Sequence, residues 1–472
     1  MDVVDLPAVE QLRLLGNNDL SCRELLEACR QRAEITERVV NALPTTDWGR
    51  ADQAAKRLDD DPSHQSRAPL RGLVTAHKDL LETAGVRTTY GSPIFAGYVP
   101  DTDHPLVAAL REAGLVSVGK TNTPEFGAGS HTFNPVHGPT RNPWNPHRSA
   151  GGSSGGATAA LACGAISLAD GGDLGGSLRN PASFCGVVGF RPTAGSIPYS
   201  TEQDSRIRMP TNGPLGRSVD DVIALHSVMA PEAISPPLPP ENPRIALAPE
   251  LGDLPLDRSV RGVVESAAGQ LEAAGWSLEY AAPDLEGADP CFEDLRALGF
   301  ALKWGALVDD PRVKSTVRTE IRAGRALSEE RVAAAILLEN RIRSAWDSFF
   351  SCYDALLCAT SQVPPFPLHH AWVTEIDGSP MSRYTDWMRS CSRITVPGGP
   401  AISIPAGFTD NGLPVGLQLS GARHQDRTLL ALAGHAEAVL NVARRPPIED
   451  LVNFSSEDLP EGPPSEFEER GA

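Results

Sequence analysis

Hydrophobic positions along this chain follow a helical period in some segments and form short continuous runs in others. Ser21 and Glu24 make a capping-box pattern, and hydrophobic residues then recur at helical spacing, which predicts an N-terminal helix. The runs RGLVTAHKD from Arg71 and LREAGLVSVGKTN, with a strand from Leu115 to Val118, are typical of strands that follow helices or turns. This alternation predicts an α/β fold with a central sheet.

The second half of the chain repeats both patterns. GPLGRSVDDVIALHSVMA reads as a turn, an N-cap at Ser218 and a helix. PEAISPPLPPENP holds too many prolines for a regular element, and we interpret it as an exposed loop because RIALAP resumes a strand pattern. Residues 286–395 are mainly helical in pattern, and AISIPAGF and GLPVGLQLSG return to strands.

The domain organisation follows from these patterns. We expect a single domain over residues 1–445, with residues 286–395 as its variable helical region. Residues 446–472 are acidic and rich in proline, which predicts a flexible, solvated tail, with a partner-binding tail as the alternative.

Composition and charge narrow the function classes. The 472 residues are 41% hydrophobic and 22% charged, which indicates a globular protein and excludes disorder as its main state. The net charge of −18 argues against a nucleic-acid binder and favours a small neutral or apolar ligand. The acidic start MDVVDLPAVEQL and the lack of a run near the roughly 18 apolar residues of a membrane span predict a cytoplasmic protein.

The eight cysteines carry little chemical signal. They form no CxxC motif and no Cys/His cluster, so neither a zinc site nor a disulfide framework is indicated. We expect reduced and mostly buried thiols, and no bound metal.

The stretch SAGGSSGGATAALACGAISLADGGDLGGS, from Ser149 to Ser177, carries the main candidate chemistry. A Gly/Ser run alone is typical of a flexible linker. Here two glycine-rich serine loops flank ATAALACGAISLA, whose Ala/Leu content predicts a buried helix. That layout favours two loops converging on one site.

Two other serine motifs compete with this stretch. Residues 151–155, GGSSG, match the G-x-S-x-G nucleophile elbow, which needs a strand immediately before the serine. The prolines of GPTRNPWNPHRSA argue against a central strand there. Ser117 and Lys120 match S-x-x-K, but they lie in a strand pattern rather than on a helix.

A serine nucleophile needs a base. Five histidines show no triad order and are expected to be surface or structural residues: His77, His104, His131, His137 and His147. Lys78 ends an apolar run, and burial there would lower the pKa of its amine toward neutrality. The alternative is a solvated lysine at the end of a strand.

These residues resemble the amidase signature family. The match runs through GGSSGGATAALACGAISLADGGDLGGSLRNPASFCGVVGFRPTAG and the flanking pieces HKDLLETAGVRTTYGS, VGKTNTPEFGAGS, TRNPWNP, GPLGRSVDDV and GLPVGLQLSG. It covers most of the chain from Ser21 to about Leu440, with residues 286–395 matching only in general character.

The resemblance implies a large mixed central β-sheet covered by helices on both faces and a Ser-cis-Ser-Lys triad. Ser177 matches the nucleophile, Ser153, 24 positions earlier, the bridging serine after a cis peptide bond, and Lys78 the base. Further implied residues are backbone N–H groups for the oxyanion (Leu174, Gly175, Gly176, Ser177), orienting side chains (Ser154, Asp173, Arg179) and substrate contacts (Gly129, Ser130). It implies no cofactor. Gly172 and Leu178 depart from the Thr and Ile common in the family, but neither belongs to the triad.

Aromatic residues suggest the substrate. Eleven of the 26 lie between residues 286 and 395. Eight of them are candidates for lining an apolar acyl or amine pocket, the alternative being a packed helical layer: Trp304, Trp346, Phe349, Phe350, Tyr353, Trp372, Tyr384 and Trp387.

Three functions remain open. The first is a stand-alone hydrolase of apolar or aryl amides, and also of esters or carbamates, with a small-molecule amide as its partner and a homodimer as an expected assembly. The second is the glutamine-hydrolysing subunit of a tRNA-dependent amidotransferase, although SIPYSTEQDSRIRMPTNGPLG lacks the GLVAFASSLDQ-like text of those subunits. The third, a non-catalytic binding relative, is disfavoured because Lys78, Ser153 and Ser177 are all present.

Overall fold

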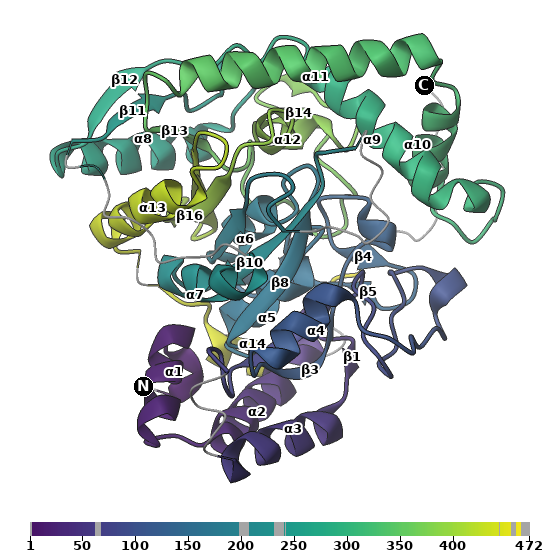
Figure 1. The fold of residues 1–472 in the computed structure, drawn as a ribbon, viewed down its shortest axis with the longest axis vertical. Helices are drawn as coiled ribbons and strands as arrows, with labels where there is room; N and C mark the ends of the chain where they lie inside the picture. The colour runs from purple at the N-terminus through teal and green to yellow at the C-terminus, as the bar shows by residue number, and fades with distance from the viewer. Residues whose placement is uncertain are drawn as a thin grey trace.

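A mixed β-sheet runs through the computed structural model of this chain and positions everything else (Figure 1). The structure describes residues 2–61, 68–197, 207–230, 240, 242–442, 444–454 and 459–463. Within these residues the sheet has eleven strands in the order β1-β3-β2-β8-β10-β9-β16-β17-β13-β11-β12. The predicted α/β class with a large mixed sheet is confirmed.

The strands of the large sheet are β1 (Thr45–Thr46), β2 (Val74–Lys78), β3 (Val116–Thr121), β8 (Leu168–Asp173), β9 (Val188–Arg191), β10 (Thr211–Gly216), β11 (Arg244–Leu247), β12 (Ser277–Tyr280), β13 (Ala355–Ala359), β16 (Ala401–Phe408) and β17 (Pro414–Ser420). Short two-stranded sheets join β4 (Phe133–Asn134) to β5 (Gly138–Pro139), β6 (Arg141–Asn142) to β7 (Asn145–Ser149), and β14 (Glu375–Ile376) to β15 (Ser379–Pro380).

Strand direction changes across the sheet. β2 runs parallel to both β3 and β8, whereas β10 pairs antiparallel with β8 and β9. On the far side β11 runs parallel to β12 and β13. Because β2 and β8 are parallel neighbours, their carboxyl ends, Lys78 and Asp173, reach the same edge of the sheet.

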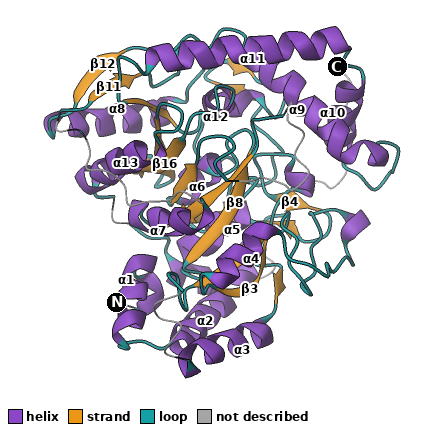
Figure 2. Cartoon of the chain, in the orientation of Figure 1, coloured by secondary structure: helices purple, strands orange, loops and turns teal. Residues whose placement is uncertain are grey.

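Helices surround this sheet, as Figure 2 shows in purple around the orange strands. They are α1 (Ala8–Asn17), α2 (Cys22–Val40), α3 (Trp48–Asp60), α4 (Pro105–Glu112), α5 (Gly155–Cys163), α6 (Arg179–Cys185), α7 (Val219–Met229), α8 (Arg258–Ala273), α9 (Ala288–Trp304), α10 (Ser315–Arg325), α11 (Glu329–Phe349), α12 (Arg389–Thr395), α13 (Asp426–Leu440) and α14 (Ile448–Val452). Single 3-10 turns are η1 (Val3–Asp5), η3 (Pro93–Phe95), η4 (Glu125–Gly127), η5 (Gly305–Leu307) and η6 (Asp386–Met388).

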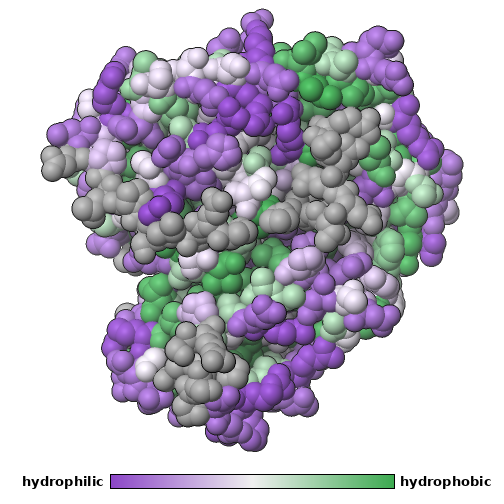
Figure 3. Space-filling view, in the orientation of Figure 1, coloured by the Kyte–Doolittle hydropathy of each residue, from purple (hydrophilic) through white to green (hydrophobic). Residues whose placement is uncertain are grey.

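The hydrophobic core lies between the sheet and these helices. One cluster joins α2, α4 and α5 to β2, β3 and β8, and a second joins α7, α8 and α13 to β9, β11, β13, β16 and β17. Hydrophilic side chains cover much of the face drawn in Figure 3, where apolar residues form separate patches. The sheet edge that carries Lys78 is therefore anchored on well-packed apolar layers.

Several local predictions are confirmed. The capping box of Ser21 and Glu24 begins α2, and the Ser218 side chain caps α7 by accepting from the N–H of Asp221. The patterns at 71–79 and around Leu115 form β2 and β3, with β3 beginning at Val116, one residue later than predicted. AISIPAGF and GLPVGLQLSG contain β16 and β17.

One local prediction is wrong. The sequence pattern predicts the end of a buried helix and the start of a glycine loop at LADGGD, but residues 168–173 form the buried strand β8 in the middle of the sheet. A Cβ on Gly171 would lie 2.6 Å from Leu178 Cδ2 and 2.7 Å from Ser154 Oγ. The glycines of this strand therefore allow close packing from neighbouring loops rather than flexibility.

The tail also differs from its prediction. Residues 448–452 form α14, and Leu451 is buried in the core cluster of α2 and α5 rather than solvated. Arg141 donates hydrogen bonds to the carbonyl of Pro460, which holds a later part of this segment on the body. Burial of the Leu451 side chain stabilises the packing of this segment against the body of the protein. The average composition of the segment does not reveal such a single buried residue. Most of the proline-rich loop at 231–243 and residues 464–472 lie outside the described residues.

The described residues also bear on the cysteines, on metal ligands and on membrane spans. Of the eight free cysteines seven are buried and Cys352 is exposed. No group of three or more metal-ligating side chains is found among the described residues. None of the described helices has the length and apolar character needed to cross a bilayer.

Gly156 provides a test of the close packing between α5 and β3. A Cβ there would lie 2.3 Å from the backbone N of Asn122 and 2.8 Å from the carbonyl O of Ala42. We expect Gly156→Ala to lower the free energy of unfolding by about 2 kcal/mol or more, measured by urea denaturation. Gly262→Ala, in exposed α8 with open space around it, is the control and should raise it by about 0.5–1 kcal/mol. Equal effects of the two substitutions would contradict the packing argument.

Candidate functional site

Lys78 is the last residue of β2, and its side chain is buried under the two glycine-rich loops. The residue is only 2% exposed. Its Nζ lies 2.8 Å from Ser153 Oγ and 2.9 Å from Ser154 Oγ, with the carbonyl O of Gly172 at 3.4 Å. The alternative of a solvated strand-end lysine is therefore wrong, and the amine faces the serines.

Burial lowers the pKa of Lys78 from its usual 10.5 to about 7, while the charges of Asp173 and Asp170 oppose the shift. Close to half of the amines are then neutral near pH 7, and a neutral amine can accept a proton. The unfolded chain binds more protons at Lys78 than the folded chain between about pH 7 and 10.5. This group therefore makes the free energy of unfolding rise with pH across that window.

Ser153 and Ser154 lie at the start of α5, where the chain arrives from β7. The Gly152–Ser153 peptide bond is cis, as the resemblance implies. The N–H of Ser154 donates to the carbonyl O of Ser177 at 3.2 Å, which ties the two serine loops together. The structure thus brings Lys78, Ser153 and the Ser177 loop to one place, although they are far apart in sequence.

Ser177 lies in the short connection between β8 and α6 and is 8% exposed. The N–H of Gly176 donates to Asp173 Oδ1 at 2.9 Å, and that of Leu178 donates to Asp173 Oδ2 at 3.2 Å. The Gly176 amide, implied as an oxyanion donor, is therefore already engaged by a carboxylate. The same bonds shape the loop around Ser177.

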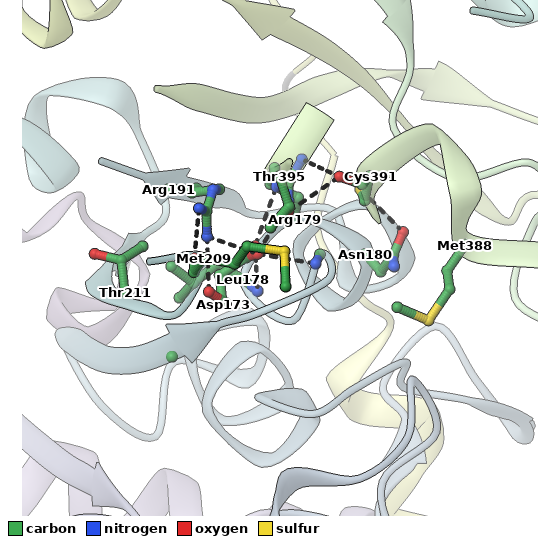
Figure 4. Close-up of polar contacts among 12 residues, drawn as sticks. Asp173, Leu178, Arg179, Asn180, Arg191, Met209, Thr211, Met388, Cys391 and Thr395 are labelled. Atoms are coloured by element: carbon green, nitrogen blue, oxygen red, sulfur yellow. Dashed lines mark hydrogen bonds and ion pairs between the residues drawn. The ribbon is translucent and has the colours of Figure 1, made fainter. Parts of the chain in front are cut away.

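Asp173 sits between two buried guanidinium groups, as Figure 4 shows. Arg179 Nη2 is 3.0 Å from Asp173 Oδ1. Arg191 Nη1 donates to the Asp173 carbonyl O at 2.7 Å and lies 3.4 Å from Oδ1. Burial alone would raise the pKa of Asp173, but the two arginines hold it below its usual range. The carboxylate is therefore charged and balanced beneath the Ser177 loop.

Arg179 also links this cluster to the C-terminal half of the chain. Its Nη1 donates to Gln418 Oε1 at 2.7 Å, and its Nη2 donates to Thr395 Oγ1 at 2.9 Å. Arg191 Nη2 donates to the carbonyl O of Met209 at 2.6 Å. Asp173 and Arg179, which the resemblance implies as orienting residues, thus form one buried cluster beneath the Ser177 loop, and Arg191 is a further member that sequence reasoning missed.

A second buried pair lies on the other side of Lys78. His77 Nδ1 is 2.6 Å from Asp170 Oδ2, and Asp170 Oδ1 accepts from the Lys78 backbone N–H at 2.9 Å. Burial would raise the pKa of Asp170, but His77 and the hydrogen bonds lower it overall. His77 was expected to be a surface or structural residue, and it is structural. Its position beside Lys78 in HKD was the only sequence signal for it.

His131 is likewise structural. Its Nε2 lies 2.9 Å from the Leu368 carbonyl O and its Nδ1 lies 2.8 Å from Ser149 Oγ. Burial lowers the pKa of His131 to about 4, so the ring is neutral at pH 7 and its polar atoms are engaged in packing the loops.

A small pocket adjoins the serine loops and contains the two expected substrate contacts, Gly129 and Ser130. Its volume is about 10 Å³, which is near the space one water molecule needs. A Cβ on Gly152 would lie 3.0 Å from the backbone C of Ser130, and one on Gly127 would lie 3.5 Å from Ser153 Oγ. Residues 127–131 therefore run directly against Ser153.

Of the eight aromatic side chains considered as a pocket lining, three lie at this small pocket. Trp372, Tyr384 and Trp387 line this small pocket. The other five pack elsewhere, Trp304 against Phe126 and Tyr90, and the remainder around β11 and β13: Trp346, Phe349, Phe350 and Tyr353. For these five the alternative of a packed layer is the right one.

The competing serine motifs do not gain support. Asn145–Ser149 is a strand before the GGSSG sequence, but it belongs to a two-stranded side sheet and not to the central one. Ser117 and Lys120 lie in β3, so they are not on adjacent turns of a helix. Lys120 Nζ donates to Thr83 Oγ1 at 3.0 Å and to the Leu81 carbonyl O, which accounts for its burial.

The positions of Lys78 and the serines indicate which chemistry this site can perform. A buried amine with a lowered pKa contacts one serine hydroxyl, and a second serine lies on an adjoining glycine loop. Such an arrangement can deprotonate a serine for attack on a carbonyl carbon. The residues of the site thus offer acid-base and nucleophilic groups.

Comparisons with known proteins show which sequences and structures this chain resembles. A family model described as Amidase matches residues 24–430. The chain is 32% identical to an acylamidase of Rhodococcus erythropolis, covering 95% of this chain and 98% of the relative. It is also 32% identical to a glutamyl-tRNA(Gln) amidotransferase subunit of Moorella thermoacetica, covering 95% and 99%. A solved structure of an amidase superposes with a TM-score of 0.84 at 31% identity, covering 92% and 99%.

The pKa of Lys78 predicts how activity depends on pH. A base must be neutral, so kcat/KM for an amide should rise with pH through about 7 and level off one to two units above it. Initial rates from pH 5.5 to 9.5 in buffers of constant ionic strength would measure this limb. A profile that stays flat down to pH 5.5 would contradict the assignment of Lys78 as the base.

Asp173 predicts a large stability effect. Asp173→Asn would leave Arg179 and Arg191 without their buried carboxylate, and we expect the free energy of unfolding to fall by about 3–5 kcal/mol. The control is Asp347→Asn, which breaks the surface pair with Arg423 and should cost under about 1 kcal/mol. Chemical denaturation monitored by circular dichroism measures both, and a small effect of Asp173→Asn would show that the arginines repack.

Proposed function

The chain belongs to the amidase signature family, and on that premise we propose that it hydrolyses the C–N bond of a linear amide through an acyl-enzyme on Ser177. The observation that carries the proposal is the buried amine of Lys78, 2.8 Å from Ser153 Oγ and with a pKa of about 7. Such a lysine is costly to bury and is suited to accept a proton.

In the proposed reaction neutral Lys78 takes the proton of Ser153, and Ser153 takes that of Ser177 as its oxygen attacks the amide carbon. The proton then returns through Ser153 to the leaving amine, and the acyl group remains on Ser177. Water attacks the acyl-enzyme by the same relay, releasing the acid. The hydrogen bond from the Ser154 N–H to the Ser177 carbonyl O supports this order of proton transfers, because it holds the loops of Ser153 and Ser177 next to each other.

We propose that the backbone N–H groups of Leu174, Gly175 and Ser177 stabilise the oxyanion, each contributing on the order of 3 kcal/mol. The amide of Gly176 acts differently, because it is bonded to Asp173 and shapes the loop. Arg179 and Arg191 add positive charge behind that loop, which favours a negative charge on its open side.

For the substrate we propose an apolar or aryl amide, bound beside Gly129 and Ser130. The support is the aromatic lining by Trp372, Tyr384 and Trp387 next to the serine loops. Esters and carbamates present a similar carbonyl carbon and would use the same donors. The small volume of the pocket implies that side chains move apart when a substrate enters.

The glutamine-hydrolysing role in an amidotransferase remains a second candidate, because the relative from such an enzyme is as similar in sequence as the acylamidase. An enzyme of that type would act only with partner chains. The stretch 196–216, whose text lacks their typical pattern, lies partly outside the described residues, so the distinction rests on assay of the isolated protein.

The decisive experiment assays the purified chain alone on an aryl amide, an ester, a carbamate and glutamine. We expect Ser177→Ala to lower amide hydrolysis about a thousandfold or more, and Lys78→Ala to do the same. Ester hydrolysis should suffer less in Lys78→Ala, because an alkoxide needs less help from a proton than an amine does. Release of the leaving group measures each rate.

Ser344→Ala, which removes an exposed serine of α11, is the control and should keep full activity. Full activity of Ser177→Ala would reject the acyl-enzyme. Activity on glutamine alone, gained only with added partner chains, would favour the amidotransferase. Absence of all hydrolysis in the wild type, with substrate binding retained, would favour the non-catalytic relative.

A further inference from the structure

Two cavities meet at Lys314, which precedes α10 on the right of Figure 1. The first is the small pocket next to the serine loops. The second is a larger cavity of about 560 Å³, a size that suits a small molecule. Phe133 and Lys314 line both cavities, so they stand between the serine loops and the larger space.

Lys314 is partly buried and its ammonium has no carboxylate partner among the residues that the structure describes. Nζ lies 4.4 Å from the centroid of the Phe133 ring, a cation–π contact. Glu125 is the nearest acid in electrostatic terms, but its Oε2 accepts from the backbone N–H of Lys314 at 2.7 Å and its Oε1 from Ser92 Oγ at 2.5 Å. The side-chain charge of Lys314 is thus not neutralised by an ion pair.

The larger cavity is basic although the whole chain is acidic. Arg312, Lys314 and Arg318 line it against one acid, Glu125, in a protein of net charge −18. Arg312 is paired with Asp310 at 2.7 Å. Arg318 Nη1 donates to the carbonyl O of Asp310 at 3.4 Å, whereas its Nε is buried without a hydrogen-bond partner. Cations that are partly removed from water are normally paired, so a cavity in which Lys314 has no ion pair favours an anionic occupant.

We propose that Lys314 is a specificity residue that binds a carboxylate on the substrate, at the end remote from the amide that is cleaved. This rests on the proposed function and narrows its substrate class to an apolar or aryl amide with an anionic end in the larger cavity. The cation–π contact with Phe133 holds the ammonium at the junction of the two cavities, where it can pair with that carboxylate. The aromatic side chains of the small pocket then contact the apolar part.

The protonation of Lys314 is compatible with this role. Burial lowers the pKa of Lys314 to about 8, against the charge of Glu125, which leaves the amine mostly protonated at pH 7. A bound carboxylate would favour the charged form further, because opposite charges attract more strongly away from bulk water.

The test uses anilides in matched pairs, with an acyl chain that ends in a carboxylate or in a methyl group, over a series of chain lengths. The wild type should prefer the carboxylate member of at least one pair. Lys314→Met should raise KM for that member at least tenfold, with kcat and the methyl member changed less than twofold. Lys314→Arg should retain much of the preference, and Lys303→Met, at an exposed lysine of α9, should leave it unchanged.

An unaltered ratio of the two KM values in Lys314→Met, or a wild type that prefers the methyl members throughout, would overturn the proposal while leaving amide hydrolysis established. If the wild type hydrolyses no anilide, the proposed function fails instead. Calorimetric Kd values for the same pairs on Ser177→Ala then still test Lys314. Equal Kd values for the two members of every pair would reject the proposal. A preference for the carboxylate member that is present in Ser177→Ala and lost in the double variant Ser177→Ala, Lys314→Met would support it.

Discussion

The site depends on excluding water from one amine, so that its pKa stays close to 7. Lys78 is enclosed by the serine loops, and the exclusion of water lowers its pKa to about 7. Two nearby carboxylates oppose that effect, since Asp173 and Asp170 both favour the protonated amine. The protein limits their influence by pairing Asp170 with His77, and Asp173 with two arginines.

That charge balance explains why the site draws on so many elements. β2 carries Lys78, its neighbour β8 carries both aspartates, and β9 carries Arg191. Arg179 begins α6 and is bonded to β17 through Gln418, so the C-terminal half of the sheet supports the Ser177 loop. A substitution far from Ser177 in sequence can therefore move the loop by altering one of these buried bonds.

The glycines of this site allow neighbouring atoms to approach the backbone closely, rather than making the backbone mobile. Gly171 lets Leu178 and Ser154 approach β8, and Gly156 lets α5 lie against the backbone of Asn122. The surroundings of Lys78 are thus built from closely packed backbone, whereas the adjoining small pocket is lined by residues from 128–133, 314–316 and 371–387.

Sequence alone determined the α/β class, most element positions, the resemblance to a family and the pairing of Lys78 with the serine loops as a hypothesis. These follow from local periodicity and from short motifs. It could not assign β8, because glycine is a poor strand former whose use here depends on what packs against it. It also missed the buried contacts of Arg191 and Asp170 and the contact of Lys314 with Phe133, because they involve neighbours distant in the chain. Only the tertiary structure decided burial and pairing, because desolvation and Coulomb interactions depend on distances that only folding sets.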